Sequence, residues 1–461
     1  MRKQVNMKKY FPEPNKLLLI AMLGWSAVVW SWVFFVDATT LTNATALSYI
    51  IRSVVFGVHV GFSIFIFYKV ASYFLRKYQE EDHLSWTFLV KFFVVWSFTE
   101  WFVSWLLALI WFGRGASIDS VTTFSSFTPI LMYTPLKFLA RYAGFYGLSA
   151  LVITFGVCLC AKKLRRFAVS FTGIILLLCL TSWFFYNVPS GSNVDVVTSS
   201  EKLSENPQVK TDAMLVILPE YGLDDFNPEQ TERRIASTNN RELFFVGSKL
   251  SPARKGLHNT LIFGSTKQGI LSEQNKTRLV AGSEYIPFVV KIPLLLTRQT
   301  EILNAFEVAR VIERGDRQIQ PSRVNDQIVI GAEVCSSIIS PEDYRHLTNE
   351  GATLLTNSAS LGVFGGSRVY RIQHDGMARF HAVANSRPFI QSALDEASYM
   401  LNHNGDKLVA ISPISTVEHE ITTNTKTTPY TLLGDWPVYI GFAYLAFLVI
   451  KVLRKRFRSL F

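Results

Sequence analysis

Long apolar runs fill most of the first 190 residues of the chain and return once near its end. About 20 consecutive apolar residues cross the hydrocarbon core of a bilayer as a helix. The runs lie at residues 17–36, 48–74, 86–112, 145–161, 167–187 and 436–453. This pattern predicts a membrane domain at residues 1–190 with about five transmembrane helices, and a last transmembrane helix with a basic tail at residues 434–461. A stretch at residues 133–142, before the fourth run, is predicted to be interfacial or re-entrant.

The segments that join these runs differ in their content of Lys and Arg. Basic residues gather before the first run, after the second and fourth runs, and after the last, whereas residues 37–46 contain none. Short loops rich in Lys and Arg stay on the cytoplasmic side of a membrane. The alternation predicts that both termini are cytoplasmic and that the segment between the fifth and last helices is extracytoplasmic.

Residues 191–433 have a different pattern, in which short β-rich runs are separated by polar segments. The predicted strands lie at residues 214–218, 242–246, 260–263, 327–330 and 353–356, and the predicted helices at residues 300–314 and 370–384. Residues 190–205 and 416–428 are polar and are predicted to be linkers. The mixture of strands and helices predicts one globular domain of the α/β or layered α+β class.

Composition and charge narrow the classes of protein that remain. Hydrophobic residues make up 49% of the 461 residues and charged residues only 18%, below the roughly 25% of soluble domains. These values exclude a disordered chain or a fibre. The net charge of +11 points to cytoplasmic loops and anionic lipid headgroups. No basic face with interleaved aromatic residues is visible, so no nucleic-acid partner is predicted.

Ionisable residues inside the apolar runs, and two histidines in the polar half, raise two further possibilities. Arg52, His59, Lys91 and Glu100 could form a transport path, because polar groups in a span face the interior of the bundle or a pathway. They could equally reach the interface or pair with a neighbouring helix, which we favour. His374 and His381 match no zinc-ligand spacing, so no metal or other cofactor is predicted.

Three reactive side chains follow predicted strands in the polar half. Glu220 comes after a strand and a proline, and Lys276 precedes a Gly-Ser turn that ends in Glu284. Cys335 ends a third strand and precedes small polar residues, where a turn can aim a thiolate outward. It is the only one of four cysteines outside the apolar runs, so this half has no internal disulfide. Cys335 is therefore either inert core packing or a nucleophile.

The chain order Glu, Lys, Cys, each at a strand end, resembles the nitrilase (carbon–nitrogen hydrolase) superfamily. With membrane helices on both sides, it resembles the apolipoprotein N-acyltransferase family within it. Further similar stretches are Ala143-Gly-Phe-Tyr-Gly-Leu-Ser149, Lys276 through Pro287, Leu355-Thr-Asn357, Gln373-His374, Met377-Ala-Arg-Phe380 and Asn385-Ser-Arg-Pro388. The similarity is good over about residues 140–410, and before them the match is mainly one of hydrophobic helices.

The resemblance implies a fold, a site and a reaction. The fold is a multi-span α-helical membrane domain plus an extracytoplasmic α/β nitrilase-like αββα sandwich at residues 191–433. Glu220 is then the general base, Lys276 the oxyanion stabiliser, Cys335 the nucleophile and Glu284 a supporting carboxylate. The partners are a phospholipid acyl donor and a diacylated lipoprotein acceptor in the bilayer, and the location is the inner membrane of a bacterium, with the catalytic domain on the periplasmic side.

Neighbouring residues depart from the family pattern. Ala281-Gly282-Ser283 replaces Pro-Phe-Gly, and Cys335-Ser336-Ser337 replaces Cys-Tyr-Glu, which removes a carboxylate two residues past the cysteine. His381-Ala-Val-Ala384 replaces Arg-Ala-x-Glu, and Val363-Phe-Gly365 only loosely resembles Trp-Phe-Gly. Six predicted spans compare with eight in the family. Three alternatives stay open: a membrane-tethered carbon–nitrogen hydrolase, an acyltransferase with another acceptor, or a non-catalytic relative in a conjugation or secretion apparatus.

Overall fold

The structure is a computed structural model of the chain. It describes all residues except 1–13, 36–44, 81–84, 113–125, 203–208, 225–234, 238, 240, 255, 281–283, 287, 305–311, 317–318, 363–365, 395, 397, 412–414 and 459–461. The departures from the family pattern at residues 281–283 and 363–365 lie outside the described residues.

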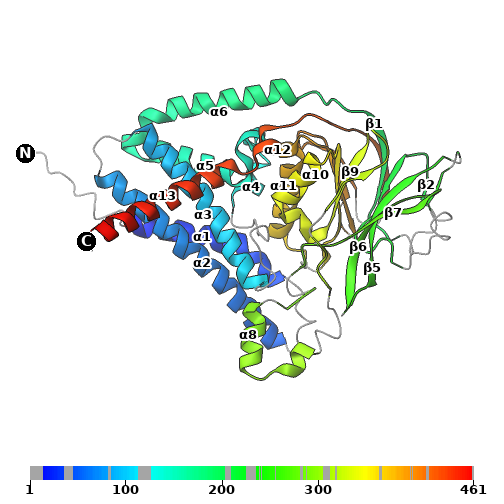
Figure 1. Ribbon diagram of the computed structural model, residues 1–461, viewed down its shortest axis with the longest axis horizontal. Coiled ribbons are helices and arrows are strands. Elements are labelled where there is room, and N and C mark those ends of the chain that lie inside the picture. Colours follow the sequence, from blue (N-terminus) through cyan, green and yellow to red (C-terminus); the bar gives the residue numbers. More distant parts are fainter. Residues whose placement is uncertain are drawn as a thin grey trace, which may run out of the picture.

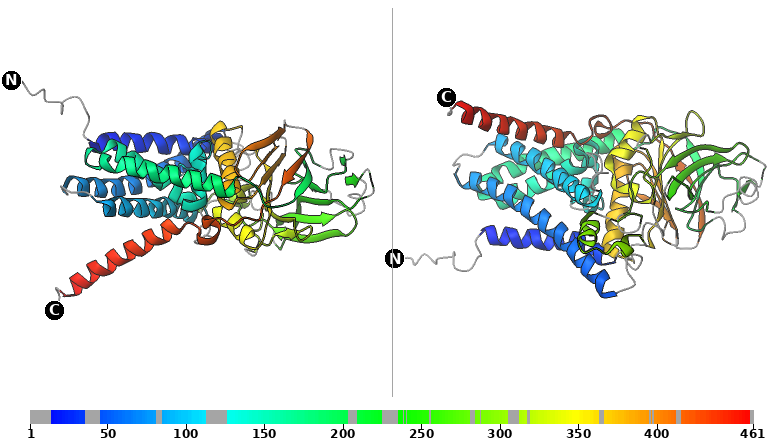
Figure 2. Two further views of the ribbon diagram at one scale, coloured as in Figure 1. Left: turned by 90° about the horizontal axis from the view of Figure 1, so that it is seen from above. Right: turned by 60° about the horizontal axis from the view of Figure 1, so that its bottom comes forward.

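Long helices form one side of the molecule and two β-sheets form the other (Figure 1). The long helices are α1 (Pro14–Trp30), α2 (Thr45–Glu80), α3 (Trp86–Phe112), α5 (Ala140–Cys160), α6 (Arg165–Tyr186) and α13 (Trp436–Arg458). Each overlaps a predicted apolar run. Among the described residues, five helices are long and apolar enough to cross a membrane, and the helical stretch Leu19–Phe35 is shorter. It consists of most of α1 and the 3₁₀ helix η2 (Ser31–Phe35). Figure 2 shows α13 diverging from the other helices.

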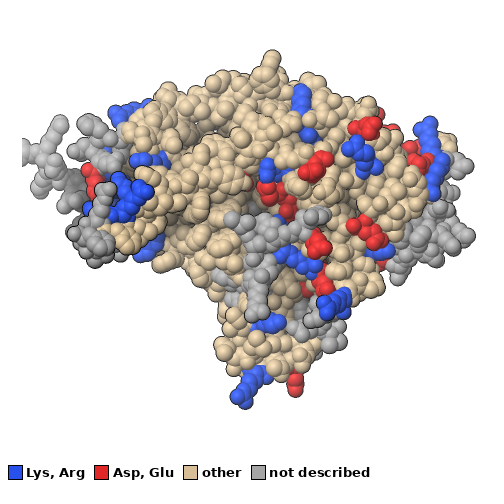
Figure 3. Space-filling view, viewed as in Figure 1, with Lys and Arg blue, Asp and Glu red and all other residues tan. Residues whose placement is uncertain are grey.

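The surface of the helical side is largely free of charge (Figure 3). Large apolar side chains stand exposed along α6 and α13, among them Leu180, Phe184, Phe442 and Phe447 at 59–75%. Lys and Arg gather at the end of the helices that lies away from the sheets (Figure 3). An apolar belt with basic residues at its outer edge is what a bilayer requires of a spanning domain.

The ionisable residues within the helices find partners inside the protein. Glu100 accepts hydrogen bonds from Trp96 Nε1 at 2.9 Å and Ser149 Oγ at 2.6 Å. Arg52 donates to the carbonyl of Phe34 at 2.7 Å, and Lys91 lies 6.0 Å from the ring centroid of Tyr444. Each contact fits a structural role, which favours packing over a transport path.

A kink in α5 is held by a residue from the far end of the chain. Gly144 has φ 71°, in the left-handed region that favours glycine. Beyond the kink, the backbone N–H of Tyr146 donates to Asp435 Oδ1 at 3.1 Å. A Cβ on Gly144 would lie 2.4 Å from that same oxygen. The Gly-x-x-Gly motif therefore brings α5 close to the start of α13.

The junction between the helical side and the sheets contains a buried arginine. Arg141 in α5 is fully buried. It donates to the carbonyls of Val383, Ser182 and His403, to Ser182 Oγ and to Asn404 Oδ1, at 2.7–3.3 Å. The short helices α4 (Thr128–Leu131) and η4 (Pro135–Leu139) lie beside it. Between them, Tyr133 donates to Asp375 Oδ2 of α11 at 2.6 Å. The stretch predicted as interfacial or re-entrant thus packs on the sheet domain.

Two six-stranded sheets form the core of the second domain. The first has the order β14-β1-β3-β5-β6-β7 and the second β13-β12-β11-β10-β9-β8. The strands of the first sheet are β1 (Asn193–Ser199), β3 (Leu215–Ile217), β5 (Phe244–Pro252), β6 (Leu257–Ser265), β7 (Gly269–Asn275) and β14 (Thr416–Thr422). Those of the second are β8 (Ser322–Arg323), β9 (Val329–Val334), β10 (Leu354–Ser360), β11 (Phe389–Leu394), β12 (Ser398–Leu401) and β13 (Lys407–Ile411). In each sheet three central strands run parallel: β1, β3 and β5 in the first, and β9, β10 and β11 in the second.

The sheets pack face to face, and helices cover the second one (Figure 1). Val196 and Ile217 of the first sheet share a core cluster with Ile330 and Ile390 of the second. Helices α10 (Pro341–Asn349) and α11 (Arg368–Asn385) separate the second sheet from the long helices. On the outer face of the first sheet, the described residues provide the small pair β2 (Val209–Thr211) and β4 (Ile235–Ser237). The predicted sandwich of sheets is confirmed.

Three sequence predictions need correction. The two predicted linkers contain strands β1 and β14, which pair antiparallel from Asn193↔Thr422 to Ser199↔Thr416. Each strand is polar on one face, which made it resemble a loop. The helix predicted at residues 300–314 is wrong at its end, because Ile312 forms a β-bridge with Leu257.

We predict that Gly144→Ala lowers the midpoint of thermal unfolding in detergent. The new Cβ must displace Asp435 and hold a left-handed φ, which together cost about 1–3 kcal/mol. Gly156→Ala in the same helix is the matched control, since nothing lies within 4 Å of its Cβ position. Equal midpoints for the two variants would contradict the role of the kink.

Candidate active site

Glu220 lies just beyond β3, and its carboxylate is held at both oxygens. Oε1 accepts from Asn259 Nδ2 at 2.6 Å and from Lys276 Nζ at 3.0 Å, and Oε2 accepts from the Ser360 backbone N–H at 2.9 Å. The next residue, Tyr221, has φ 62° and donates its N–H to Ser248 Oγ at 3.0 Å. A tight turn thus directs the Glu220 side chain inward.

Lys276 follows β7 and joins two carboxylates. Its Nζ lies 3.0 Å from Glu220 Oε1 and 2.8 Å from Glu284 Oε1, and the Lys276 side chain is 0% exposed. The second oxygen of Glu284 accepts from the Val280 N–H at 2.6 Å. The Lys276 ammonium therefore joins the segment after β3 to the loop after β7, which are far apart in the sequence.

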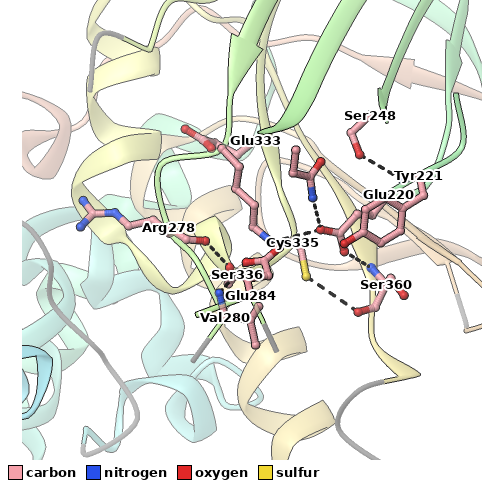
Figure 4. A network of polar contacts seen from close by, with 12 residues as sticks. Glu220, Tyr221, Ser248, Arg278, Val280, Glu284, Glu333, Cys335, Ser336 and Ser360 are labelled. Carbon is pink, nitrogen blue, oxygen red and sulfur yellow. Dashed lines mark hydrogen bonds and ion pairs between the residues drawn. The ribbon is translucent and has the colours of Figure 1, made fainter. Parts of the chain in front are cut away.

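Cys335 lies where β9 passes into the 3₁₀ helix η6 (Cys335–Ile339). It has φ 48°, which is costly for a residue with a side chain. Its Sγ lies 3.8 Å from the carbonyl of Ser360, the residue whose N–H binds Glu220. Figure 4 shows Glu220, Glu284 and Cys335 pointing toward one another. The structure thus brings all four predicted site residues together.

Burial governs the charges of this cluster. Burial and the nearby Glu220 carboxylate raise the pKa of the Cys335 thiol well above its usual value, although Lys276 opposes this. Burial also raises the pKa of Glu220, against the attraction of Lys276. Burial alone would lower the pKa of Lys276, but Glu220 and Glu284 outweigh it and raise that pKa well above its usual range. At neutral pH the lysine is charged and the cysteine is a protonated thiol.

A second ion pair supports the loop after Lys276. Arg278 makes two hydrogen bonds to Asp343 of α10, both at 2.9 Å. The carbonyl of Arg278 accepts from the Ser336 hydroxyl, and Figure 4 shows this contact next to Cys335. The pair therefore links the lysine loop to the residue that follows the cysteine.

Several residues that contact this cluster were not predicted from the sequence. Asn259, Ser360, Arg278 and Tyr370 surround the predicted residues, and Tyr370 also meets Trp32 of η2 edge to face at 5.7 Å between ring centroids. The signal for Asn259 was an amide inside a strand, where its side chain could not be assigned to one face. Ser360 acts through its backbone, which leaves no trace in the sequence.

The two histidines considered as metal ligands lie in α11. His381 Nε2 donates to the carbonyl of Ile338 at 2.7 Å in the tautomer that this contact requires. The ring centroid of His381 lies 4.2 Å from that of Tyr344, with the two rings tilted by 35°. Both histidines are buried, and His381 serves as a packed core side chain.

Comparison with known proteins defines the class of this domain first. Residues 195–397 match the family model of the carbon–nitrogen hydrolases. The solved carbon–nitrogen hydrolase from Helicobacter pylori G27 is 15% identical, with a TM-score of 0.36, over 50% of this chain and 89% of that chain. The family match over residues 195–397, together with the two packed sheets, gives the second domain a nitrilase-like fold.

Relatives that match more of the chain share one specific enzyme name. Apolipoprotein N-acyltransferase of Pasteurella multocida is 22% identical over 90% of this chain and 84% of that protein. The protein of the same name from Photobacterium profundum is 22% identical over 79% of this chain and 73% of that protein. That of Vibrio vulnificus is 23% identical over 50% of this chain and 47% of that protein. The resemblance predicted from the sequence is therefore confirmed.

We predict that Glu333→Gln stabilises the protein increasingly as pH rises. Burial, with a further contribution from Asp343, raises the pKa of Glu333 from 4.5 to about 8. Between these values the unfolded chain has lost a proton that the folded chain keeps, so the wild type loses stability as pH rises. The expected gain near pH 8 is about 1–3 kcal/mol.

The measurement is the midpoint of thermal unfolding in detergent at pH 4.5, 6 and 8. Glu273→Gln on β7 is the control, because Glu273 is exposed and its replacement should change the midpoint equally little at each pH. A gain for Glu333→Gln that does not depend on pH would contradict a buried, protonated carboxyl.

Proposed function

We propose that the protein is an N-acyltransferase that moves an acyl chain from a phospholipid to the N-terminal amine of a diacylglyceryl-cysteine lipoprotein. The observation that carries the proposal is the cluster of Cys335, Glu220 and Lys276 in a nitrilase-like domain attached to apolar helices. The names of the relatives support the choice of reaction. Cys335 is the nucleophile, Glu220 the general base, Lys276 the oxyanion stabiliser and Glu284 the supporting carboxylate.

The first half-reaction forms a thioester. Because the thiol is protonated at rest, Glu220 takes the proton from Sγ as the sulfur attacks the ester carbonyl of the phospholipid. The tetrahedral oxygen then carries a negative charge beside the ammonium of Lys276. When the carbon–oxygen bond breaks, Glu220 returns the proton to the departing lysophospholipid oxygen.

The second half-reaction transfers the acyl chain. The acceptor amine attacks the thioester carbonyl and gives a proton to Glu220. A carbon–nitrogen bond forms, the carbon–sulfur bond breaks, and the proton passes to the sulfur. An ammonium has three N–H donors, and described residues take two of those of Lys276, which leaves one to serve the oxyanion in both halves.

Two apolar features beside the helices support lipid substrates rather than soluble ones. Helix α8 (Phe288–Leu296) begins four residues after Glu284 and exposes Ile292, Leu295 and Leu296 at 48%, 50% and 79%. A pocket of about 430 Å³ lies between the long helices and the start of α10, lined by aromatic side chains that include Trp101, Tyr439 and Phe442. Both features place apolar surface beside the helical domain, where a bilayer lipid would lie.

We expect intact-protein mass spectrometry to show the thioester directly. After incubation with phospholipid, the wild type should gain the mass of one acyl chain, and a diacylated lipopeptide should discharge it. Cys335→Ala should gain nothing. Glu220→Gln, which cannot accept the proton, should acylate about 10²–10⁴-fold more slowly.

The possible outcomes separate the candidate functions. An acyl gain that the lipopeptide cannot discharge would keep the thioester and reject this acceptor. Discharge by water alone, with release of a free fatty acid, would favour the membrane-tethered hydrolase. A folded protein with no gain in mass would reject the transferase and favour a non-catalytic relative.

We also propose that the protein lies in a bacterial inner membrane, with the nitrilase-like domain at residues 191–433 on the periplasmic side and both termini in the cytoplasm. The basic ends of α2, α5 and α6 support this sidedness. A reporter that is active only in the periplasm should be active when fused after residue 300 and inactive when fused after residue 163. The reverse pattern would reject the topology.

A further inference from the structure

A row of buried polar side chains crosses the second sheet beneath Cys335. Glu333 on β9, Asn357 on β10 and Gln391 on β11 are neighbours in register, and each is at most 1% exposed. Ser358 and Ser392 follow Asn357 and Gln391. Ser358 donates to the carbonyl of Leu218, just after β3, and Ser392 to that of Ser199 in β1. Because side chains alternate along a strand, the row faces the other way, toward α10 and α11.

The hydrogen bonds of this row allow a single orientation of the Asn357 amide. Gln391 Nε2 donates to Asn357 Oδ1 at 3.1 Å and to the carbonyls of Asn357 and Ser392, both at 3.2 Å. Asn357 Nδ2 then donates to the Cys335 carbonyl at 3.2 Å and lies 3.5 Å from that of Glu333. Turning either amide over would bring oxygen against oxygen, which burial makes costly.

The bond to Cys335 acts where the backbone is strained. A non-glycine residue at φ 48° costs about 1–2 kcal/mol and persists only where its surroundings hold it. Asn357 binds the carbonyl of Cys335 itself, and the hydroxyl of Ser336 binds Arg278 on the other side. These two contacts fix the peptide unit that carries the thiol.

We propose that Asn357, oriented by Gln391, is a positioning residue that fixes the left-handed backbone of Cys335 and so aims its thiol at Glu220. The inference rests on the proposed function where it concerns acyl transfer. The aim of the thiol can also be measured without any lipid, so a failure of one idea can be told from a failure of the other.

The test variant is Asn357→Asp, which keeps the size of the side chain and replaces its donor with an acceptor. We expect kcat for acyl transfer to fall about 100-fold, because a displacement of about 1 Å in the reacting geometry has that effect. KM should stay within twofold, since Asn357 is fully buried and lies below the cysteine. A purely structural role would lower the amount of folded enzyme without this split between kcat and KM.

Ser392→Ala is the matched control. Ser392 is adjacent to Gln391 and fully buried, and its hydroxyl bonds the Ser199 carbonyl at 2.6 Å on the opposite face of the sheet. It should lose a similar amount of thermal stability and keep kcat within twofold. An equal loss of kcat in the two variants, or a loss below threefold in Asn357→Asp, would overturn the inference.

Alkylation of Cys335 by iodoacetamide provides the lipid-free measurement. Asn357→Asp should change its rate at least tenfold relative to wild type and Ser392→Ala, whether or not the wild type accepts an acyl chain. An unchanged alkylation rate would overturn the inference even if the transferase is real.

If Asn357→Asp does not fold, Gln391→Met is the second variant. It removes the donor that orients Asn357, and kcat should fall about tenfold. No fall in that variant would reject the role.

Discussion

The contact of Lys276 with two carboxylates is the interaction on which the rest of the site depends. An isolated ion could not be buried at this depth, because removing it from water costs several kcal/mol. Lys276 is tolerated only because Glu220 and Glu284 lie within 3.0 Å of its Nζ. Those partners come from the end of β3 and from the loop after β7, so the two chain segments cannot separate without stranding a charge. Burial and the Glu220 carboxylate raise the pKa of the Cys335 thiol, although Lys276 opposes this, so the reaction needs a base in contact range of the sulfur.

The position of this site over the helices depends on a second set of buried polar contacts. Arg141 donates five hydrogen bonds to acceptors in the sheet domain and in α6. Asp435 ties α13 to the kink of α5, and Tyr133 ties the preceding segment to α11. The Arg141 contacts are buried, and in such surroundings a lost hydrogen-bond partner costs about 1–3 kcal/mol. A domain held in this way presents one fixed face to the helices, which the proposed transfer between bilayer substrates requires.

The sequence was informative where local pattern and chemistry coincide. Apolar length predicted the helices. The chain order of Glu220, Lys276 and Cys335, each at a predicted strand end, gave the family resemblance, and that resemblance implied a shared site. The sequence was uninformative where a residue takes its role from a distant partner. Strands β1 and β14 read as linkers because each is stabilised by the other, more than 200 residues away. Asn357 appeared only at the end of a stretch similar to the family, and Gln391 was not singled out. Only their register under Cys335 reveals what they bind.

The altered residues around the cysteine can be judged in the same terms. The resemblance implies a carboxylate two residues past the nucleophile, where this chain has Ser337, whereas a buried carboxyl, Glu333, stands two residues before it. Ser337 and Arg278 lower the pKa of Glu333, but burial and Asp343 still raise it to about 8. Glu333 is therefore mainly neutral at pH 7 and adds little charge near Cys335. The field at the sulfur comes from Lys276 and its carboxylates, so the missing acid has not been replaced as a charge. Beneath the cysteine lie the uncharged, hydrogen-bonded side chains of Asn357 and Gln391. They hold the backbone of Cys335 in place and do not shift the pKa of its thiol by charge.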